Sequence, residues 1–73
     1  MCVASLRSMT HAMKAKSTLY EHGIYAEIIK LEPKMTKRGC AYGISFDCIN
    51  LALVEDALNS RKIKYSEILS LPI

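Results

Sequence analysis

Two segments of this sequence repeat each other forty residues apart, and the repeat restricts the fold. Residues 25–31 read Tyr-Ala-Glu-Ile-Ile-Lys-Leu and residues 65–71 read Tyr-Ser-Glu-Ile-Leu-Ser-Leu, so Tyr, Glu, Ile and Leu recur in register. The same offset relates Ala12 to Ala52 in segments with a helical pattern. Two β-α-β halves related in this way form the ferredoxin-like split β-α-β sandwich.

Capping residues place two helices between the expected strands. Ser8 or Thr10 begins the first helix, because a hydroxyl can accept hydrogen bonds from the free N–H groups of the first turn. Gly23 ends it, because glycine adopts the left-handed conformation at little cost. Asp47 is a good N-cap for the second helix. The strands are expected at residues 3–6, 24–31, 40–46 and 63–71.

Apolar residues at three- and four-residue steps predict the buried faces of the helices. The set in the first helix is Met9, Ala12, Met13, Leu19 and Tyr20, with the Lys16 stem at its margin. The set in the second helix is Leu51, Val54 and Leu58, with Glu55 and Asp56 toward solvent.

These elements predict an α+β fold in one domain covering residues 1–73. It is the ferredoxin-like split β-α-β sandwich (βαββαβ), with a four-stranded antiparallel sheet and two helices on one face. Right-handed crossovers put the strands in the order 4-1-3-2. Both faces of the outer strands carry apolar side chains, which favours a homodimer or a partner on the open sheet face.

A basic turn containing glycine precedes Cys40 and makes this thiol the candidate reactive group. Between Lys30 and Arg38 lie four basic residues and one acidic residue, a net charge of +3, while six basic and six acidic residues balance elsewhere. Neighbouring cations such as Lys37 favour the thiolate, the reactive form of cysteine. Gly39 directly precedes the cysteine. A buried, unreactive Cys40 at the start of a strand remains the alternative.

The predicted topology sets the neighbours of Cys40. The third strand runs antiparallel to the first, so its start lies beside the end of the first strand and the start of the first helix. We therefore expect Cys40 near Arg7, Thr10 and His11, where the helix N-terminus also favours a thiolate. His11 either shares a proton with the sulfur or is simply solvated.

The other two cysteines are expected at the opposite end of the sheet. Three cysteines, an odd number, do not form a disulfide framework, so we expect Cys2 to pack in the core or fray with the terminus. Cys48 begins the second helix, and neither thiol can readily reach Cys40. The sequence contains no C-x-x-C motif, so it predicts neither a dithiol redox pair nor a zinc knuckle, and we expect no metal and no cofactor.

Composition argues against two further classes of partner. No apolar run is long enough for a membrane span and no signal-peptide pattern is present, so a cytoplasmic protein is expected. A net charge of +3 is small for nucleic-acid binding, and Tyr42 and Phe46 do not form the aromatic pattern of RNA-binding sheets.

Four short motifs occur in order along the chain: Thr10-His11, Gly23-Ile24, Pro33 and Cys40. In these positions, and over nearly its whole length, the sequence resembles the small selenium/sulfur carrier-like domains of bacteria. Ala41 departs from the pattern, because the family usually has glycine there, and Gly39 can compensate for the lost backbone freedom.

The resemblance implies a carrier rather than a true enzyme. Cys40 would hold sulfur or selenium as a persulfide or selenosulfide, supported by Lys37, Arg38, Gly39, Thr10 and His11. Its partners would be a cysteine desulfurase-type donor and an acceptor protein. The alternative is a non-catalytic protein-interaction or dimerisation module with the same ferredoxin-like fold.

Overall fold

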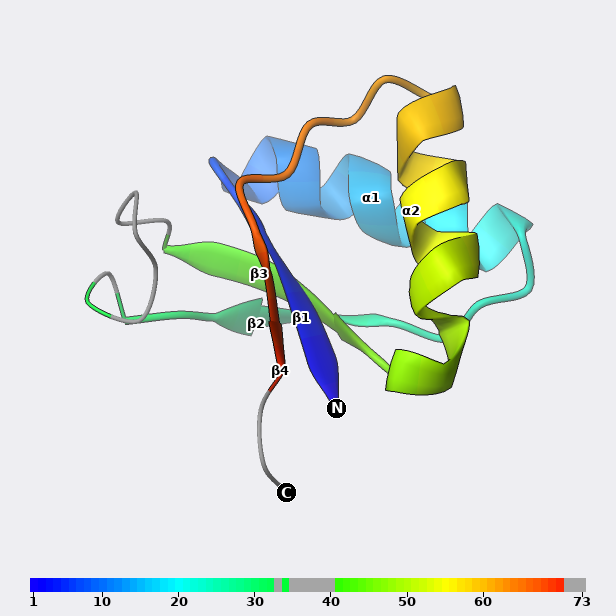
Figure 1. Cartoon of the computed structure of the whole chain (residues 1–73). Helices are drawn as coiled ribbons and strands as arrows, with labels where there is room; N and C mark the ends of the chain where they lie inside the picture. The colour runs from blue at the N-terminus through cyan, green and yellow to red at the C-terminus, as the bar shows by residue number, and fades with distance from the viewer. Residues whose placement is uncertain (33, 35–40, 71–73) are drawn as a thin grey trace.

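The protein folds as an α+β unit with one four-stranded antiparallel sheet and two helices (Figure 1). The structure is a computed structural model that describes residues 1–32, 34 and 41–70. Its elements are β1 (Cys2–Leu6), α1 (Met9–Glu21), β2 (Glu27–Lys30), β3 (Tyr42–Phe46), the 3₁₀ turn η2 (Cys48–Asn50), α2 (Leu51–Ser60) and β4 (Ile68–Ser70). The strand order is β2-β3-β1-β4, which is 4-1-3-2 counted from the other edge.

The central strands β1 and β3 pair around a point of local symmetry. Ala4 faces Ile44, which stands forty residues later at the equivalent position of the second half. On either side of this pair, Cys2 faces Phe46 and Leu6 faces Tyr42. The sequence repeat therefore corresponds to a structural repeat of two β-α-β halves.

Two buried serines form equivalent hydrogen bonds in the two halves. The Ser5 hydroxyl donates to the backbone carbonyl of Glu67 (3.2 Å), and the Ser45 hydroxyl donates to the backbone carbonyl of Glu27 (3.3 Å). Ser5 and Ser45 are forty residues apart, and so are Glu27 and Glu67. In each bond the serine lies in a central strand and the glutamate lies in or beside an edge strand. These bonds satisfy hydroxyls that would otherwise be buried at a cost.

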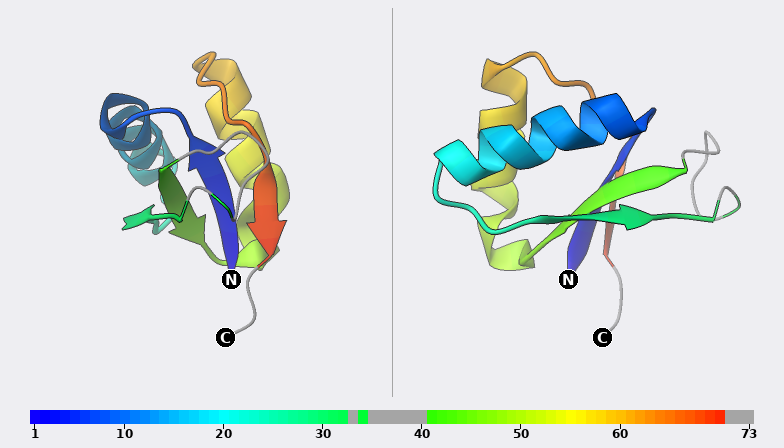
Figure 2. Two further views of the ribbon diagram at one scale, coloured as in Figure 1. Left: turned by 90° about the vertical axis from the view of Figure 1, so that its left-hand side faces the viewer. Right: turned by 180° about the vertical axis from the view of Figure 1, so that it is seen from behind.

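The core forms between the helices and one face of the sheet. One row of side chains across the four strands, Ile28, Ile44, Ala4 and Ile68, faces the helices. The helices contribute Ala12, Ala15, Leu19, Val54, Ala57 and Leu58. Figure 2 shows both helices on this side of the sheet.

The predicted buried face of α1 is wrong at three positions. Met9, Met13 and Tyr20 are 43%, 58% and 79% exposed, whereas Ala12 and Leu19 are fully buried as predicted. The periodicity allows two adjacent stripes along the helix. The stripe with alanines faces inward, because small side chains let the helix backbone approach the sheet closely.

The buried face of α2 is close to the prediction. Val54 and Leu58 are fully buried, Leu51 packs partly buried against the core, and Asp56 is exposed. Asp47 is a cap as predicted, but it caps η2 rather than α2, and its side chain accepts from the Ile49 N–H at 3.1 Å.

The hydrogen-bonded strands are shorter than the sequence suggested. Residues 24–26 precede the β2 ladder, although Ile24 and Ala26 are buried. Residues 63–67 run as a loop before β4, and only Ile63 among them is buried. The predicted strand ends at Cys40 and Leu71 lie outside the described residues.

Both helices end in the same hydrogen-bonded turn, a Schellman motif. After α1, the Gly23 N–H donates to Tyr20 O (3.0 Å) and the Ile24 N–H donates to Leu19 O (2.9 Å). Gly23 has the positive φ of 73° that the sequence predicted for a helix-ending glycine.

After α2, the equivalent left-handed residue is a lysine. The Lys62 N–H donates to Asn59 O (3.0 Å) and the Ile63 N–H donates to Leu58 O (2.9 Å). Lys62 has a φ of 56° and is the one non-glycine residue with positive φ in the described part of the chain.

Cys2 and Cys48 form a disulfide, whereas the odd number of cysteines led us to expect no disulfide framework. Their Cα atoms are 5.0 Å apart, a separation suitable for a disulfide. The reason is the register, because Cys2 faces Phe46 and Cys48 follows Phe46 by two residues. Cys2 is 5% exposed, so it is a core residue rather than a frayed terminus.

The sheet face away from the helices contains small and buried residues near its centre. A Cβ added to Gly43 would lie 2.6 Å from Val3 Cγ1 and 2.9 Å from Leu31 Cδ1, so glycine leaves room for both side chains over β3. Most of the more exposed large apolar residues of the described chain lie instead on the helices or in η2, namely Met9, Met13, Tyr20, Ile49 and Leu53. The other two are Met1, before β1, and Tyr25, before β2.

Candidate functional site

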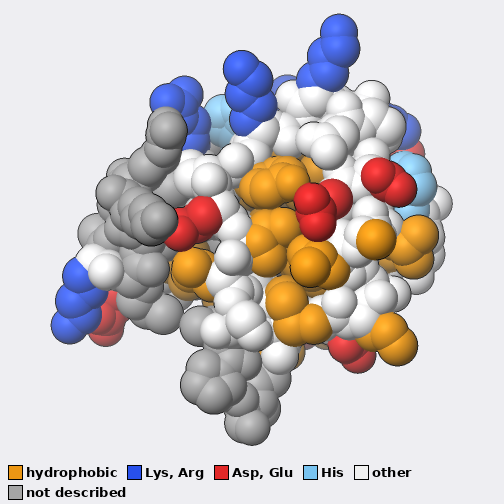
Figure 3. All heavy atoms as spheres, viewed as in Figure 1, with side chains coloured by type: hydrophobic (Ala, Val, Ile, Leu, Met, Phe, Trp, Pro, Cys, Tyr) orange, Lys and Arg blue, Asp and Glu red, His pale blue; other side chains and the backbone are white. Residues whose placement is uncertain are grey.

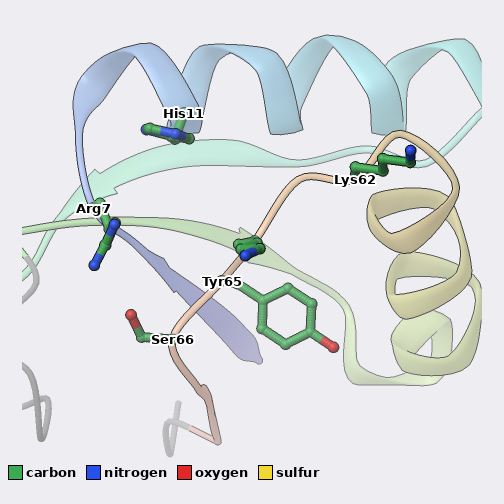
Figure 4. A pocket seen from close by; sticks show the side chains of 6 residues that line it. Arg7, His11, Lys62, Tyr65 and Ser66 are labelled. Carbon is green, nitrogen blue, oxygen red and sulfur yellow. The ribbon is translucent and has the colours of Figure 1, made fainter.

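A pocket of about 410 Å³ opens where β1 leads into α1 (Figure 4). It is lined by Arg7, His11, Lys62, Lys64, Tyr65 and Ser66. Two segments far apart in the sequence meet there, the end of β1 with the first turn of α1, and the loop from α2 to β4.

A bulge beside β1 shapes the second of these segments. The Ser66 N–H donates to Ser5 O and the Ser5 N–H donates to Glu67 O, both at 2.9 Å, so two residues of the outer chain oppose one residue of β1. The Ser5 hydroxyl also accepts from the Glu67 N–H at 3.1 Å. Bulges of this kind bend a strand and redirect side chains. Here the bulge lies directly after Tyr65, at the wall of the pocket.

The pocket is strongly cationic. Arg7, Lys62 and Lys64 form no ion pair within the described part of the chain, and none of the described residues that line the pocket is acidic. In contrast, Arg61 pairs with Glu21 and Lys34 pairs with Glu32. Figure 3 shows basic side chains and a histidine along the upper edge of this face.

His11 is exposed and held by the helix cap. The Ser8 hydroxyl accepts from the His11 backbone N–H (3.3 Å) and lies 2.7 Å from Nδ1. A hydroxyl that accepts from the amide can donate its own proton to Nδ1, which leaves Nε2 of the neutral ring as an N–H donor. Ser8 is therefore the predicted N-cap, and it also orients the imidazole. Thr10 is exposed in the same turn but does not line the pocket.

Tyr65 forms a wall of the pocket with its ring. Its hydroxyl points away from Arg7 and His11 (Figure 4). Burial raises the pKa of Tyr65 above its ordinary value, and the negative charge and hydrogen bond of Glu55 raise it further. The phenol therefore stays protonated near neutral pH and adds no negative charge to the pocket.

Four of the predicted site residues, Lys37, Arg38, Gly39 and Cys40, lie outside the described residues. The residues that follow them are described. The Leu31 N–H donates to Ala41 O (2.7 Å), and Tyr42 pairs with Leu6 at the end of β1. The beginning of β3 therefore lies beside the end of β1, which is the arrangement that the topology predicted.

No group of three or more His, Cys, Asp or Glu side chains in the described ranges is placed to hold a metal ion. The helices of the described chain are also too short or too polar to cross a membrane.

A protein family described as "Putative Se/S carrier protein-like" matches residues 1–70 of the 73-residue chain. The chain belongs to this family. The match includes the first repeat segment, the second as far as Ser70, and the cysteine that the sequence singled out. No curated protein and no solved structure matches the chain. The family description indicates carriage of selenium or sulfur, which involves proteins that supply and receive the element.

Sequence reasoning missed the two pocket lysines. The sequence predicted that Arg7 and His11 lie near Cys40. It assigned no role to Lys62 and Lys64, which were counted only among the six basic residues that balance six acidic ones outside residues 30–38. A sharper signal was present in the repeat. Residues 23–25 read Gly-Ile-Tyr, whereas residues 62–65 read Lys-Ile-Lys-Tyr, so one lysine replaces glycine and the other is an added residue.

Proposed function

We propose that this protein is a carrier of sulfur or selenium and that Cys40 holds the transferred atom. The observation that supports this most directly is the bond between Cys2 and Cys48. It commits two of the three cysteines to each other and leaves Cys40 for transfer chemistry. Family membership over residues 1–70 supports the same assignment.

The proposed transfer is a thiol exchange through the outer atom of a persulfide. The Cys40 thiolate attacks the outer sulfur of a donor persulfide, R–S–SH, to form Cys40–S–SH and release the donor thiolate R–S⁻. With a selenosulfide donor the product is Cys40–S–SeH. A nucleophile of the acceptor then attacks the outer atom, and Cys40 leaves as the thiolate. The rate of such exchange depends on the thiolate fraction and on access to the sulfur.

The basic residues before Cys40 would stabilise its anion. Arg38 and Lys37 carry positive charge two and three residues before Cys40, and Gly39, directly before Cys40, would compensate for the backbone freedom lost at Ala41. Thr10 and His11 lie in the first turn of α1, at the corner formed by β1 and the start of β3. The partners of this relay would be a cysteine desulfurase-type donor and a separate acceptor protein.

Incubation with a cysteine desulfurase and cysteine tests the proposal by intact-mass spectrometry. We expect the mass of one added sulfur atom, mapped to Cys40 and absent from Cys40→Ser. The matched control is the double variant Cys2→Ser/Cys48→Ser, which should keep the adduct. An unmodified protein, or an adduct on Cys2 or Cys48 alone, would contradict the assignment.

The pH dependence of alkylation tests the activation of the thiol. We expect an apparent pKa for Cys40 below about 8.5, the value of a free cysteine. Lys37→Gln and Arg38→Gln should each raise it, whereas Lys14→Gln on α1 removes the same charge elsewhere and should not. A pKa at or above the free value would remove the activation argument.

A second function is favoured by the exposed apolar residues on the helices. Met13 and Leu53 are each 58% exposed and Tyr20 is 79% exposed, so the helix side offers contact area to a partner protein or a second copy. In this alternative the ferredoxin-like domain is a non-catalytic interaction or dimerisation module. Partner binding would then survive Cys40→Ser, whereas the carrier would lose transfer.

A further inference from the structure

We propose that the pocket lined by Arg7, His11 and Lys64 binds the phosphate group of a small phosphorylated molecule. This site goes beyond the proposed carrier function: it shares His11 with the residues proposed to support Cys40, but it does not include Cys40 itself. It is built from side chains of the described chain alone.

The charge of the pocket selects an anion. Arg7, Lys62 and Lys64 bring a formal charge of +3 to one cavity, without an ion pair among the described residues. Unpaired cations gathered around a concave space repel one another, and a bound anion relieves that repulsion. A phosphate monoester, which carries up to two negative charges, matches this charge better than a single carboxylate.

The donors also match phosphate in kind. The guanidinium of Arg7 presents several N–H groups in a planar fork suited to phosphate oxygens, and the ammonium of Lys64 acts as a mobile point charge. His11 can add its Nε2–H, because Ser8 occupies Nδ1. Lys62 is the more distant cation, since its ammonium points away from Arg7 (Figure 4).

The size and shape of the site favour a small ligand. About 410 Å³ lies within the range of small-molecule pockets, and leaves room for more than a phosphate group beside the Tyr65 ring. Nucleic acid is usually held along an extended stripe of cations. Here the cations line a single pocket.

The position of Lys62 gives independent support. A lysine at φ 56° occupies a conformation that costs about 1 kcal/mol for a residue with a Cβ, and Gly23 occupies the equivalent position after α1. Lys62, which adopts this unfavourable conformation, is one of the residues that line the cationic pocket. An unfavourable backbone conformation kept at a cavity is consistent with a functional role for the side chain.

Amide NMR titration with inorganic phosphate and with glycerol phosphate, at constant ionic strength and near neutral pH, tests the proposal. We expect saturable shifts confined to residues 7–11 and 62–66. Arg7→Gln and Lys64→Gln should each weaken binding about tenfold, the effect of losing one charge-assisted hydrogen bond. Lys14→Gln is the control, because Lys14 is an exposed lysine on α1 outside the pocket.

Three results would overturn the proposal. Shifts spread over the surface, or an equal loss in Lys14→Gln, would mean nonspecific attraction by the net charge. Tighter binding of a single-stranded oligonucleotide than of glycerol phosphate through the same residues would assign the surface to nucleic acid. Unchanged phosphate affinity in folded Lys64→Gln, checked by its amide spectrum, would remove the pocket from the binding site. Desulfurase-dependent labelling of Cys40 is a separate readout, so failure of one proposal leaves the other measurable.

Discussion

α1 and α2 end in the same hydrogen-bonded turn, but the left-handed residue is Gly23 in the first and Lys62 in the second. Glycine adopts positive φ at little cost, whereas a residue with a Cβ does not. The first turn therefore follows the usual rule for ending a helix. The second departs from it, at a residue that lines the cationic pocket.

The departure is not confined to one residue. The turn after α2 also contains Lys64, an added residue before Tyr65 that has no counterpart between Ile24 and Tyr25. Both lysines line the pocket. The two halves thus share contacts of the fold, such as the Ser5 and Ser45 hydrogen bonds, and differ at the turn that lines the pocket.

The largest expected effect comes from the covalent link between the halves. The disulfide joins Cys2 to Cys48, whereas the residues at the equivalent positions of the other half, Tyr42 and Ser8, cannot form one. With a sequence separation of 46 residues, its reduction should lower the free energy of unfolding by about 4 kcal/mol. Urea unfolding of the oxidised and the reduced protein measures this difference.

Cys48→Ser should reproduce the loss and make stability insensitive to reductant. Cys40→Ser is the matched control and should keep the full response to reductant. The link is contradicted if an alkylating agent labels all three cysteines of the unfolded, unreduced protein.

The next effect compares the two serines. Ser5 donates to Glu67 O and also accepts from the Glu67 N–H, whereas Ser45 has the single bond to Glu27 O. Ser5→Ala removes two hydrogen bonds and should cost about 2 kcal/mol, against about 1 kcal/mol for Ser45→Ala, which removes one. Urea midpoints of the two variants and the parent protein, compared at equal m-values, give both losses in the free energy of unfolding. Equal losses would mean that the bulge at Glu67 does not depend on the Ser5 hydroxyl.

Much of the fold could be predicted from short-range signals. The forty-residue repeat, the helix-ending Gly23 and the capping Ser8 depend on local chemistry, and the structure confirms the last two at the predicted residues. The antiparallel sheet with its two helices follows from the repeat. The buried face of α1 did not, because the sequence offers two adjacent apolar stripes and only packing against the sheet chooses between them.

The site was less accessible to sequence reasoning. The disulfide depends on register, since Cys2 faces Phe46 across the sheet, and no spacing rule relates residues 2 and 48. The cationic pocket was hidden for a similar reason. Basic and acidic residues balance in the sequence outside residues 30–38, but Arg7, Lys62 and Lys64 line one pocket whose described lining residues include no acid. The role of Cys40 stays a prediction.

The smallest expected effect tests the helix ends directly. In Lys62→Gly the glycine adopts the positive φ without the cost of a Cβ, but it also makes the unfolded chain more flexible. The first effect is the larger, so the substitution should stabilise the protein by about 0.5 kcal/mol. Gly23→Ala should destabilise by about 1 kcal/mol through the backbone alone, because a Cβ at Gly23 meets no atom within 4 Å. Thermal and urea unfolding measure both changes.

Lys62→Gly should also weaken phosphate binding about twofold, because its ammonium is the most distant of the three cations and acts through partly screened charge. A gain in stability together with a loss of affinity is the specific expectation. If Lys62→Gly gained stability and bound phosphate as well as the parent protein, the strained lysine would have no role in the pocket. The difference between the two helix ends would then be a feature of folding alone.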